Sequence, residues 1–561
     1  MSNPLYHVYL VLSMLIFLFL LPFQASSGAL NQGTAFEIRN LLEGDESQLK
    51  MEYLGGRIYS RSYLLTFYSE RAFMPGWLTG STPSCEALEL RLLIQQSKFD
   101  GLIPEDYHLD QLNILFEKSL NGTSVNERDL ALMDILLSDA FILLAKHLYQ
   151  GKVHPEHLKG IWDIQSKEND PKLLEKLNLA LARQDVRQQL FSLHPKFPIY
   201  QRMRHSLKKY HEMEQTGSGL LWNNPEPEKP LEPGQRAEQV PAIRDILVFW
   251  KDLENYAPDT NRIDVYDSLM AEGVKRFQLR HGLQPDGKLG KATIQALNQS
   301  PRTLIEKAMV NMERLRWLPD TTLQELILVN IANYSMDYIR ARDTLLHSNA
   351  IVGQSYRKTP VFNAELSYLV FNPTWTVPPT ILKNDVIPAV KKDIGYLARK
   401  NMKILDFSGK EIDPNTINWA GISSDSFPYM VRQASGRQNS LGLVKFMFPN
   451  KYNVYIHDTP SRELFFRADR ALSSGCIRIQ KPLELAQILL ADQPLWTEER
   501  IKDTMNGGKE QPVASKKKIP VIILYLTFWT DGANRENIRR DIYSRDGDLL
   551  KLLKLPLTYE N

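Results

Sequence analysis

Apolar and polar positions alternate in two different ways along the chain. The stretch 129–145, in which Asp134, Ser138 and Asp139 interrupt the apolar positions, predicts a helix within a long helix-rich region. In the second half of the chain, short apolar runs are separated by Asn, Pro and Gly, which is typical of strands. The ten-residue run 519–528 is too short to span a membrane and predicts a buried strand.

The breaks between these patterns divide the chain, which at 561 residues is too long for one compact domain. A polar, Pro-rich run at 223–234 predicts a linker or surface loop after the first helical region. We therefore predict a multidomain α+β protein. Its parts are a leader at 1–29, a helical domain at 30–235, a small helical module at 240–300, a connecting helix at 301–325 that returns to the helical domain, a β-rich domain at 326–540 and a tail at 541–561.

The leader has the pattern of an export signal. Residues 8–23 contain no charge, and small residues follow at 25–29. An apolar core of this length before a small-residue site is typical of a secretory signal and is short for a membrane span. No Lys or Arg precedes the apolar run, so the usual basic start is missing. We expect residues 1–29 to act as a signal peptide or as a membrane anchor.

Charge and cysteine content exclude several classes of protein. Lys and Arg number 68 and Asp and Glu number 65, which leaves a net charge of +3. A dedicated nucleic-acid binder normally carries a concentrated basic excess, so no nucleic-acid partner is predicted. The two cysteines, Cys85 and Cys476, are too few for a disulfide scaffold or a four-cysteine zinc site. His154 and His157 are separated by a proline and have no further ligand nearby, so no metal site is predicted.

The small helical module carries a specific pattern. Leu269, Val274 and Phe277 predict an apolar helix face, and 286–287 (Asp-Gly) predicts a turn with positive φ. Thr293 lies near the start of the next helix. Together these V-x-x-F-Q, D-G and G-x-x-T elements resemble the small three-helix peptidoglycan-binding module over about 35 residues. The resemblance implies a surface for glycan or stem peptide and not a catalytic site.

A second pattern combines a thiol, an imidazole and a guanidinium. On a strand, Tyr455 and His457 share one face; in the run C-I-R-I, Cys476 and Arg478 share a face while the isoleucines enter the core. The small residues 473–475 can present the thiol at a strand entrance beside free backbone N–H groups. An adjacent imidazole and a fixed guanidinium favour thiolate. This set supplies the nucleophile, base, cation and amides that cysteine acyl transfer needs.

The residues alone leave other interpretations open. A lone cysteine is more often a small buried hydrophobe, and a histidine before Asp-Thr-Pro is more often a turn residue. In an exported protein Cys476 can also pair with Cys85, which would make the thiol structural.

The same segments resemble the active-site signature of the L,D-transpeptidases of the YkuD type, the cysteine enzymes that cross-link peptidoglycan. The family pattern H-D/G-T…S-x-G-C-I/V-R is matched in order by His457, Ser473, Gly475, Cys476 and Arg478.

Flanking segments extend this resemblance to the large periplasmic members that join a helical scaffold, a peptidoglycan-binding module and the catalytic domain. The flanking matches are at 100–107, 311–319, 372–379 and 441–450. In those members a lid-like subdomain occupies the interval that corresponds to about 383–440, so we expect a lid over the cleft here. A surface elaboration without a gating role is the alternative. The resemblance also implies a periplasmic location.

The resemblance implies a mechanism for the candidate residues. Cys476 attacks the carbonyl of the third stem residue, and His457 serves as general base and then as acid for the departing D-alanine. The N–H of Cys476, neighbouring amides or the Tyr455 hydroxyl stabilise the oxyanion. Arg478 holds the strand arrangement or attracts the donor's carboxylate, and the sequence does not decide between these. Ser473 closes the turn, Asp458 receives no role, and no cofactor is implied.

Peptidoglycan stem peptides and glycan are the implied partners, and carbapenem-type β-lactams the implied covalent inhibitors. The implied product is a 3→3 cross-link. An L,D-carboxypeptidase or endopeptidase with the same site and water as acceptor is one alternative, and attachment of a protein lysine to the wall is another. A non-catalytic wall-binding scaffold, with Cys476 tied to Cys85, is the alternative from a different class.

Overall fold

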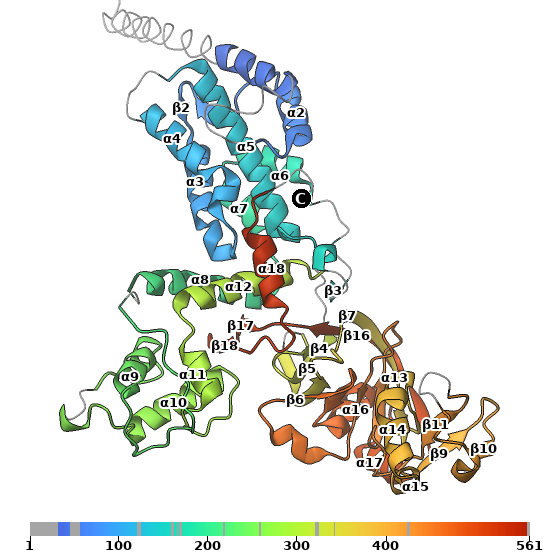
Figure 1. The fold of residues 1–561 in the computed structure, drawn as a ribbon. Helices are drawn as coiled ribbons and strands as arrows, with labels where there is room; N and C mark the ends of the chain where they lie inside the picture. Colours follow the sequence, from blue (N-terminus) through green and yellow to red (C-terminus); the bar gives the residue numbers. More distant parts are fainter. Residues whose placement is uncertain are drawn as a thin grey trace, which may run out of the picture.

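The computed structural model describes residues 32–44, 57–120, 125–158, 162–164, 167, 171–216, 219–256, 260–319, 325–341, 343–422 and 427–557. In Figure 1 a helical body lies above a small three-helix module and a β-rich domain, so the predicted α+β class is confirmed. The apolar run 8–23 lies outside the described residues. Within the described ranges, no helix is long and apolar enough to cross a membrane.

The upper body, which we call the helical scaffold, is built around one long helix. Its helices are residues 32–43, α2 (Arg61–Glu70), α3 (Cys85–Gln96), α4 (Leu109–Leu120), α5 (Glu127–Gln150), α6 (Leu173–Ala182) and α7 (Val186–Phe191), with a short hairpin of β1 (Leu78–Thr79) and β2 (Thr82–Pro83). The helix predicted at 129–145 is confirmed within α5, which is buried on nearly every side. A helix that is apolar all round forms the centre of a core.

The polar residues of α5 fasten it to the loops before it. Asp134 has no solvent exposure and accepts hydrogen bonds from the Tyr68 hydroxyl (2.7 Å) and from the N–H groups of Gly76 (2.9 Å) and Trp77 (2.8 Å). Asp139, equally buried, accepts from the Ser60 N–H at 2.7 Å. Buried carboxylates with several donors are structural anchors, because each donor would otherwise be unpaired.

Three helices connect the scaffold to the rest of the molecule: α8 (Pro198–Thr216), α12 (Pro301–Arg316) and α18 (Asp546–Lys554). Helix α12 packs against both others. The segment for which the sequence predicts only a tail thus contains a packed helix, and Leu557 beyond it is part of the scaffold core. Lys152 donates to the Leu553 and Leu555 carbonyls at 2.8 and 2.9 Å, which places a cation at the C-terminal end of α18.

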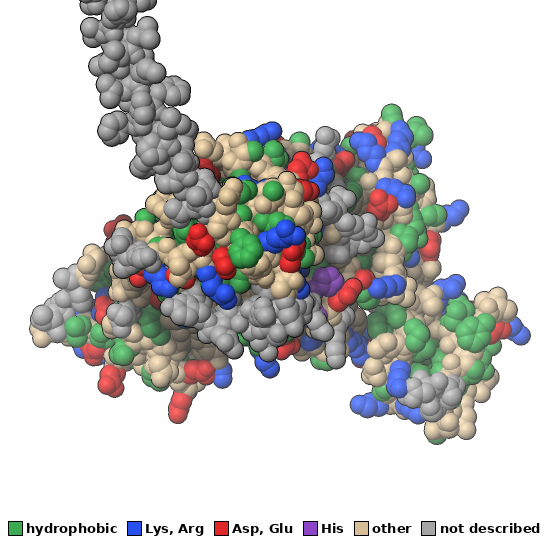
Figure 2. Space-filling view, turned by 90° about the horizontal axis from the view of Figure 1, so that it is seen from above, with side chains coloured by type: hydrophobic (Ala, Val, Ile, Leu, Met, Phe, Trp, Pro, Cys, Tyr) green, Lys and Arg blue, Asp and Glu red, His purple; other side chains and the backbone are tan. Residues whose placement is uncertain are grey.

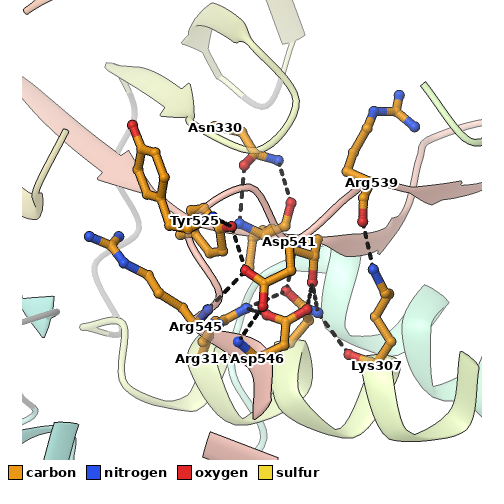
Figure 3. A network of polar contacts seen from close by, with 12 residues as sticks. Lys307, Arg314, Asn330, Tyr525, Arg539, Asp541, Arg545 and Asp546 are labelled. Carbon is orange, nitrogen blue, oxygen red and sulfur yellow. Dashed lines mark hydrogen bonds and ion pairs between the residues drawn. The ribbon is translucent and has the colours of Figure 1, made fainter. Parts of the chain in front are cut away.

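A buried polar network joins these helices to the β-rich domain (Figure 3). Arg314 on α12 donates to Asp546 at 2.7 Å, and Lys307 on the same helix donates to the Arg539 carbonyl at 2.6 Å. The Tyr525 hydroxyl donates to Asp541 at 2.6 Å. The C-terminal segment is therefore bound both to α12 and to the end of the sheet.

The small module consists of α9 (Val240–Phe249), α10 (Ser268–Arg280) and α11 (Lys291–Leu297). Gly287 has φ +71°, as a turn of this type requires, and its N–H donates to the Gln278 side chain at 2.9 Å. Nε2 of Gln278 donates to the Thr293 hydroxyl at 3.1 Å and thereby ties α10 to α11. Leu269 is 59% exposed, so its placement on the apolar face is wrong; Met270 is the buried residue.

The β-rich domain is a sheet closed on itself. Its strands run β12-β13-β15-β6-β5-β4-β16-β7, and β12 also pairs with β7, which closes the ring, while β14 pairs with β6 and β3 with β7. The bounds are β3 (Trp162–Asp163), β4 (Glu325–Asn330), β5 (Ser335–Arg340), β6 (Asp343–Gly353), β7 (Val361–Phe371), β12 (Val444–Met447), β13 (Ile456–His457), β14 (Ala471–Ser473), β15 (Ile477–Ile479) and β16 (Gln511–Leu524).

Other elements flank this barrel: α16 (Pro482–Leu490), α17 (Glu498–Asn506) and the hairpin β17 (Phe528–Thr530) with β18 (Glu536–Ile538). The buried strand predicted at 519–528 is confirmed only to Leu524, where β16 ends. Beyond that point the backbone N–H of Leu526 turns to the Asn330 side chain at 3.0 Å. On the face that Figure 2 shows, basic and acidic side chains are interspersed among apolar ones, in line with the small net charge.

Most of the interval 383–440 forms a subdomain with a core of its own. It contains α13 (Pro379–Ile381), a π-helical turn (Leu382–Val386), α14 (Ile387–Lys392) and α15 (Gly395–Arg399), and a four-stranded sheet of β8 (Trp375–Thr376), β9 (Met402–Leu405), β10 (Glu411–Ile412) and β11 (Met430–Gln433). Its core is separate from that of the barrel and includes Val377, Val390, Ile404 and Val431. We call this unit the insertion subdomain.

Candidate active site

Two short parallel strands bring the predicted residues together. Strands β13 and β15 pair with His457 opposite Arg478, and the Ile477 N–H donates to the Tyr455 carbonyl at 3.1 Å. Because side chains alternate along a strand, Tyr455 and His457 share one face with Cys476 and Arg478. Ile477, on the other face, is completely buried.

The loop before Cys476 is held by a ring of hydrogen bonds. The Ser473 hydroxyl donates to the Cys476 carbonyl at 2.5 Å and accepts from the Gly475 N–H at 3.1 Å, so Ser473 closes the turn. Gly475 has φ +121°, a conformation that residues with a Cβ rarely adopt. The Thr359 hydroxyl donates to the Gly475 carbonyl at 2.8 Å from the β6–β7 loop.

That β6–β7 loop is supported in turn by the C-terminal segment. The Tyr543 hydroxyl donates to the Gly353 carbonyl at 2.5 Å and accepts from the Thr359 N–H at 3.1 Å. The residues after the barrel therefore help to fix the position of the thiol.

The Cys476 thiol lies in a partly buried, polar environment. It donates to the Asn453 carbonyl at 3.8 Å. Burial raises the pKa of Cys476, while the N–H and hydroxyl of Tyr455 and the charge of Arg478 lower it; the balance leaves it above its usual value. Both cysteines of the chain are free, and Cys85 begins α3 of the scaffold, so the alternative with a Cys85–Cys476 disulfide is wrong.

His457 is 4% exposed, and a backbone carbonyl orients it. Its Nδ1 lies 2.5 Å from the Asp458 carbonyl, so Nδ1 carries the proton and Nε2 keeps its lone pair. Burial, together with the positive charges of Arg478 and Lys445, lowers the pKa of His457 to about 3, so the ring is neutral at ordinary pH. The sequence does not name this orienting group. The Asp458 carboxylate instead accepts from the Leu443 N–H and pairs with Arg462, at 2.9 and 2.8 Å.

Within the described residues the thiol is hydrogen-bonded to Asn453 and Tyr455, and Cys476 and His457 share a face without a hydrogen bond between them. Catalytic hydrogen bonds are often long before substrate binds. The site therefore holds a neutral thiol and a neutral imidazole on one face of the sheet.

The insertion subdomain contacts residues that neighbour Cys476. Trp375 on β8 hydrogen-bonds to Tyr455, which contacts the thiol. The Arg357 guanidinium binds Asp385 of the π-helical turn at 2.6 and 3.2 Å and donates to the Ser474 hydroxyl at 2.9 Å. Sequence reasoning missed Arg357 and Thr359, since no local pattern marks them. Trp375 lies in the flanking match at 372–379, but its hydrogen bond to Tyr455 was not predicted. Lys445, which lies beside His457, follows from strand alternation in 443–448.

The scaffold also reaches the site. Strand β3 pairs with β7, and its Asp163 accepts from the Tyr452 hydroxyl at 2.8 Å and from Lys451 at 2.9 Å. Tyr452 precedes Asn453, whose carbonyl accepts the thiol hydrogen bond, so a scaffold residue braces the loop beside Cys476. In the part of the chain that the structure describes, no cluster of three or more His, Cys, Asp or Glu could hold a metal ion.

Comparison with known families agrees with this geometry. Residues 324–521 match the model of the L,D-transpeptidase catalytic domain of the YkuD family, and both paired strands lie within that stretch. The chain carries an L,D-transpeptidase catalytic domain. Residues 237–297 match a putative peptidoglycan-binding domain, and residues 62–207 match a scaffold domain.

One curated relative and one solved structure show the extent of the similarity. A putative L,D-transpeptidase of Haemophilus influenzae is 39% identical over 269 residues, which are 47% of this chain and 54% of that protein. The matched stretch thus spans about half the length of the relative. The crystal structure of an L,D-transpeptidase from Xylanimonas cellulosilytica, 12% identical, matches over 54% of this chain and all of its own with a TM-score of 0.17, too low to support an argument.

Proposed function

We propose that the protein is an L,D-transpeptidase that forms 3→3 cross-links in peptidoglycan and releases the terminal D-alanine of a tetrapeptide donor stem. The observation that carries this proposal is the shared face of His457 on β13 and Cys476 just before β15, inside a stretch that matches the L,D-transpeptidase catalytic domain. The peptidoglycan-binding module supports the same substrate.

The first half of the reaction forms a thioester. The thiol proton passes to Nε2 of His457 while Sγ of Cys476 attacks the carbonyl carbon of the third stem residue. The N–H of Cys476 and the Tyr455 hydroxyl are the oxyanion donors, and one such donor typically contributes ~3 kcal/mol. The C–N bond then breaks, and D-alanine leaves with the proton from His457.

The second half transfers the acyl group. The side-chain amine of a second stem attacks the thioester and gives up a proton to His457, and the bond to Sγ breaks to regenerate Cys476. We expect the insertion subdomain to act as a lid that keeps water out at this stage, because its Trp375 contacts Tyr455 and its Asp385 contacts Arg357. Exclusion of water favours an amine acceptor over hydrolysis.

Such a reaction requires contact with the cell wall, so we propose that the chain is exported to the periplasm, with residues 1–29 as signal peptide or anchor. We also propose that carbapenem-type β-lactams acylate Cys476. Neither a nucleic acid nor a cofactor is part of this proposal.

Product analysis tests the proposed reaction. The purified chain is incubated with a disaccharide-tetrapeptide, beside Cys476→Ala and the matched control Cys85→Ala, which removes the other free thiol. We expect a cross-linked dimer that lacks one D-alanine with the wild type and Cys85→Ala, and none with Cys476→Ala. Release of D-alanine without dimer would replace the proposal by L,D-carboxypeptidase activity, and activity of Cys476→Ala would overturn it.

A further inference from the structure

Two cationic side chains lie on the strands on either side of His457. Lys445 on β12 pairs with His457 on β13, and His457 pairs with Arg478 on β15. Residues paired across neighbouring strands project from the same face, about 4.8 Å apart from strand to strand. Lys445 and Arg478 therefore flank the imidazole, one on each side, and both charges act on it.

These two cations lack the carboxylate partners that two buried arginines of α12 have. Arg316 binds Glu313, and Arg314 binds Asp546 at 2.7 Å. By contrast, no Asp or Glu among the described residues lies within ion-pair distance of Arg478 or Lys445, and Nε of Arg478 is buried without a hydrogen-bond partner. The carboxylate whose charge reaches Lys445 is Glu510, which accepts from the Thr374 N–H at 2.7 Å.

A partly buried guanidinium with an unpartnered Nε is costly unless an anion pairs with it. A guanidinium keeps its proton at any ordinary pH and matches a carboxylate with two parallel N–H groups. The thiol is protonated at rest, so Cys476 does not supply the missing anion before reaction.

We propose that Arg478 and Lys445 bind the terminal carboxylate of the donor stem and so select a leaving group of one residue. This inference rests on the proposed function, which supplies the donor. Arg478 is two residues beyond Cys476 on the same face, about 6.6 Å along the strand. In a tetrapeptide stem the carboxylate is one residue beyond the carbonyl that Cys476 attacks. A second terminal residue would move it further by about 3.5 Å.

A pair of substrates tests this subsite directly. The wild-type chain is assayed for D-alanine or D-alaninamide release with two disaccharide-tetrapeptides, one with a free terminal carboxylate and one with a terminal carboxamide. A hydrogen bond to a charged group typically contributes ~1.5–3 kcal/mol, so we expect kcat/KM to be roughly 10- to 100-fold lower for the carboxamide. The ratio of kcat/KM for the carboxylate substrate to that for the carboxamide should collapse toward 1 in Arg478→Gln. It should be partly retained in Arg478→Lys and should fall to an intermediate value in Lys445→Met.

The ratio separates this role from a general effect on the thiol. If Arg478 only stabilised the thiolate, Arg478→Gln would slow both substrates equally and leave the ratio unchanged, and that result would overturn the inference. Equal rates for the two substrates in the wild type would also overturn it while leaving the proposed function intact. Absence of turnover with the free-carboxylate substrate would instead contradict the proposed function. Lys445→Met provides the same test if Arg478→Gln does not fold.

Discussion

Charged side chains are arranged in opposite ways in the scaffold and in the candidate active site. On α5, Asp134 has three donors, two of them from backbone N–H groups. On β12 and β15, Lys445 and Arg478 flank His457 without an ion pair among the described residues. A charge with hydrogen-bond partners stabilises one conformation, whereas a charge without a partner can gain free energy by binding a ligand of opposite charge. The contrast supports a structural role for the scaffold network and the proposed binding role for Lys445 and Arg478.

The largest effect on activity is expected from Cys476→Ala. Loss of the nucleophile should lower the rate of D-alanine release at least about a thousandfold, because the steps of acyl transfer share the same group. The free energy of unfolding should change little, since the side chain is small. The assay is D-alanine release by mass spectrometry, and a loss of less than tenfold would contradict the assignment.

Asp134→Ala should mainly lower the free energy of unfolding, in contrast to Cys476→Ala. It leaves two buried N–H groups and the Tyr68 hydroxyl unpaired, so we expect the scaffold to lose about 3 kcal/mol or more of its free energy of unfolding. Urea unfolding followed by fluorescence measures this loss. The control is Asp245→Ala, an exposed position on α9, where the change should stay within about 0.5 kcal/mol. Equal effects in the two variants would remove the contrast with the active site.

The low pKa of His457 predicts a specific dependence of stability on pH. The unfolded chain protonates this imidazole near pH 6.5, whereas the folded chain does so only at about 3. The unfolded state thus binds more protons between these values, and the contribution of His457, complete above pH 6.5, is lost as the pH falls toward 3. The free energy of unfolding of the wild type relative to His457→Gln should therefore decrease as the pH falls from 6.5 toward 3. A difference that is constant with pH would contradict it.

The smallest effect is expected at the insertion subdomain. Asp385→Asn removes the ion pair with Arg357, and a pair this exposed contributes up to ~1 kcal/mol, so we expect a rise in KM of no more than about fivefold. Faster hydrogen exchange over 379–399 should accompany it. Asp393→Asn is the matched control, because it breaks an ion pair with Arg399 inside the same subdomain. Identical results for the two variants would exclude a coupling through Arg357.

Several of these features could be predicted from the sequence because they depend on the short periods of strands and helices. The period of two along a strand places Cys476 beside Arg478 on one face, and the apolar run at 129–145 specifies α5. Leu269 shows the limit of this reasoning. Its spacing of five residues to Val274 fits a helix face less well than the spacing of four from Met270, and Met270 is the buried one.

Contacts between distant parts of the chain could not be predicted in this way. Thr359 reaches Gly475 over 116 residues, and Asp163 reaches Tyr452 over 289. Tyr543, in the segment interpreted as a tail, donates to the Gly353 carbonyl and so supports the β6–β7 loop that contains Thr359. These hydrogen bonds depend on the closure of the barrel, and a single polar residue in a loop carries no periodic signal of its partner.

The most direct test of the account is to trap the acyl-enzyme. The full chain is mixed with disaccharide-tetrapeptide in the absence of an added acceptor, quenched in acid, digested and analysed by mass spectrometry. The account predicts a disaccharide-tripeptide joined through a thioester to the fragment that contains Cys476, together with one released D-alanine. Release of D-alanine without any adduct on Cys476, at a rate that Cys476→Ser retains, would contradict it.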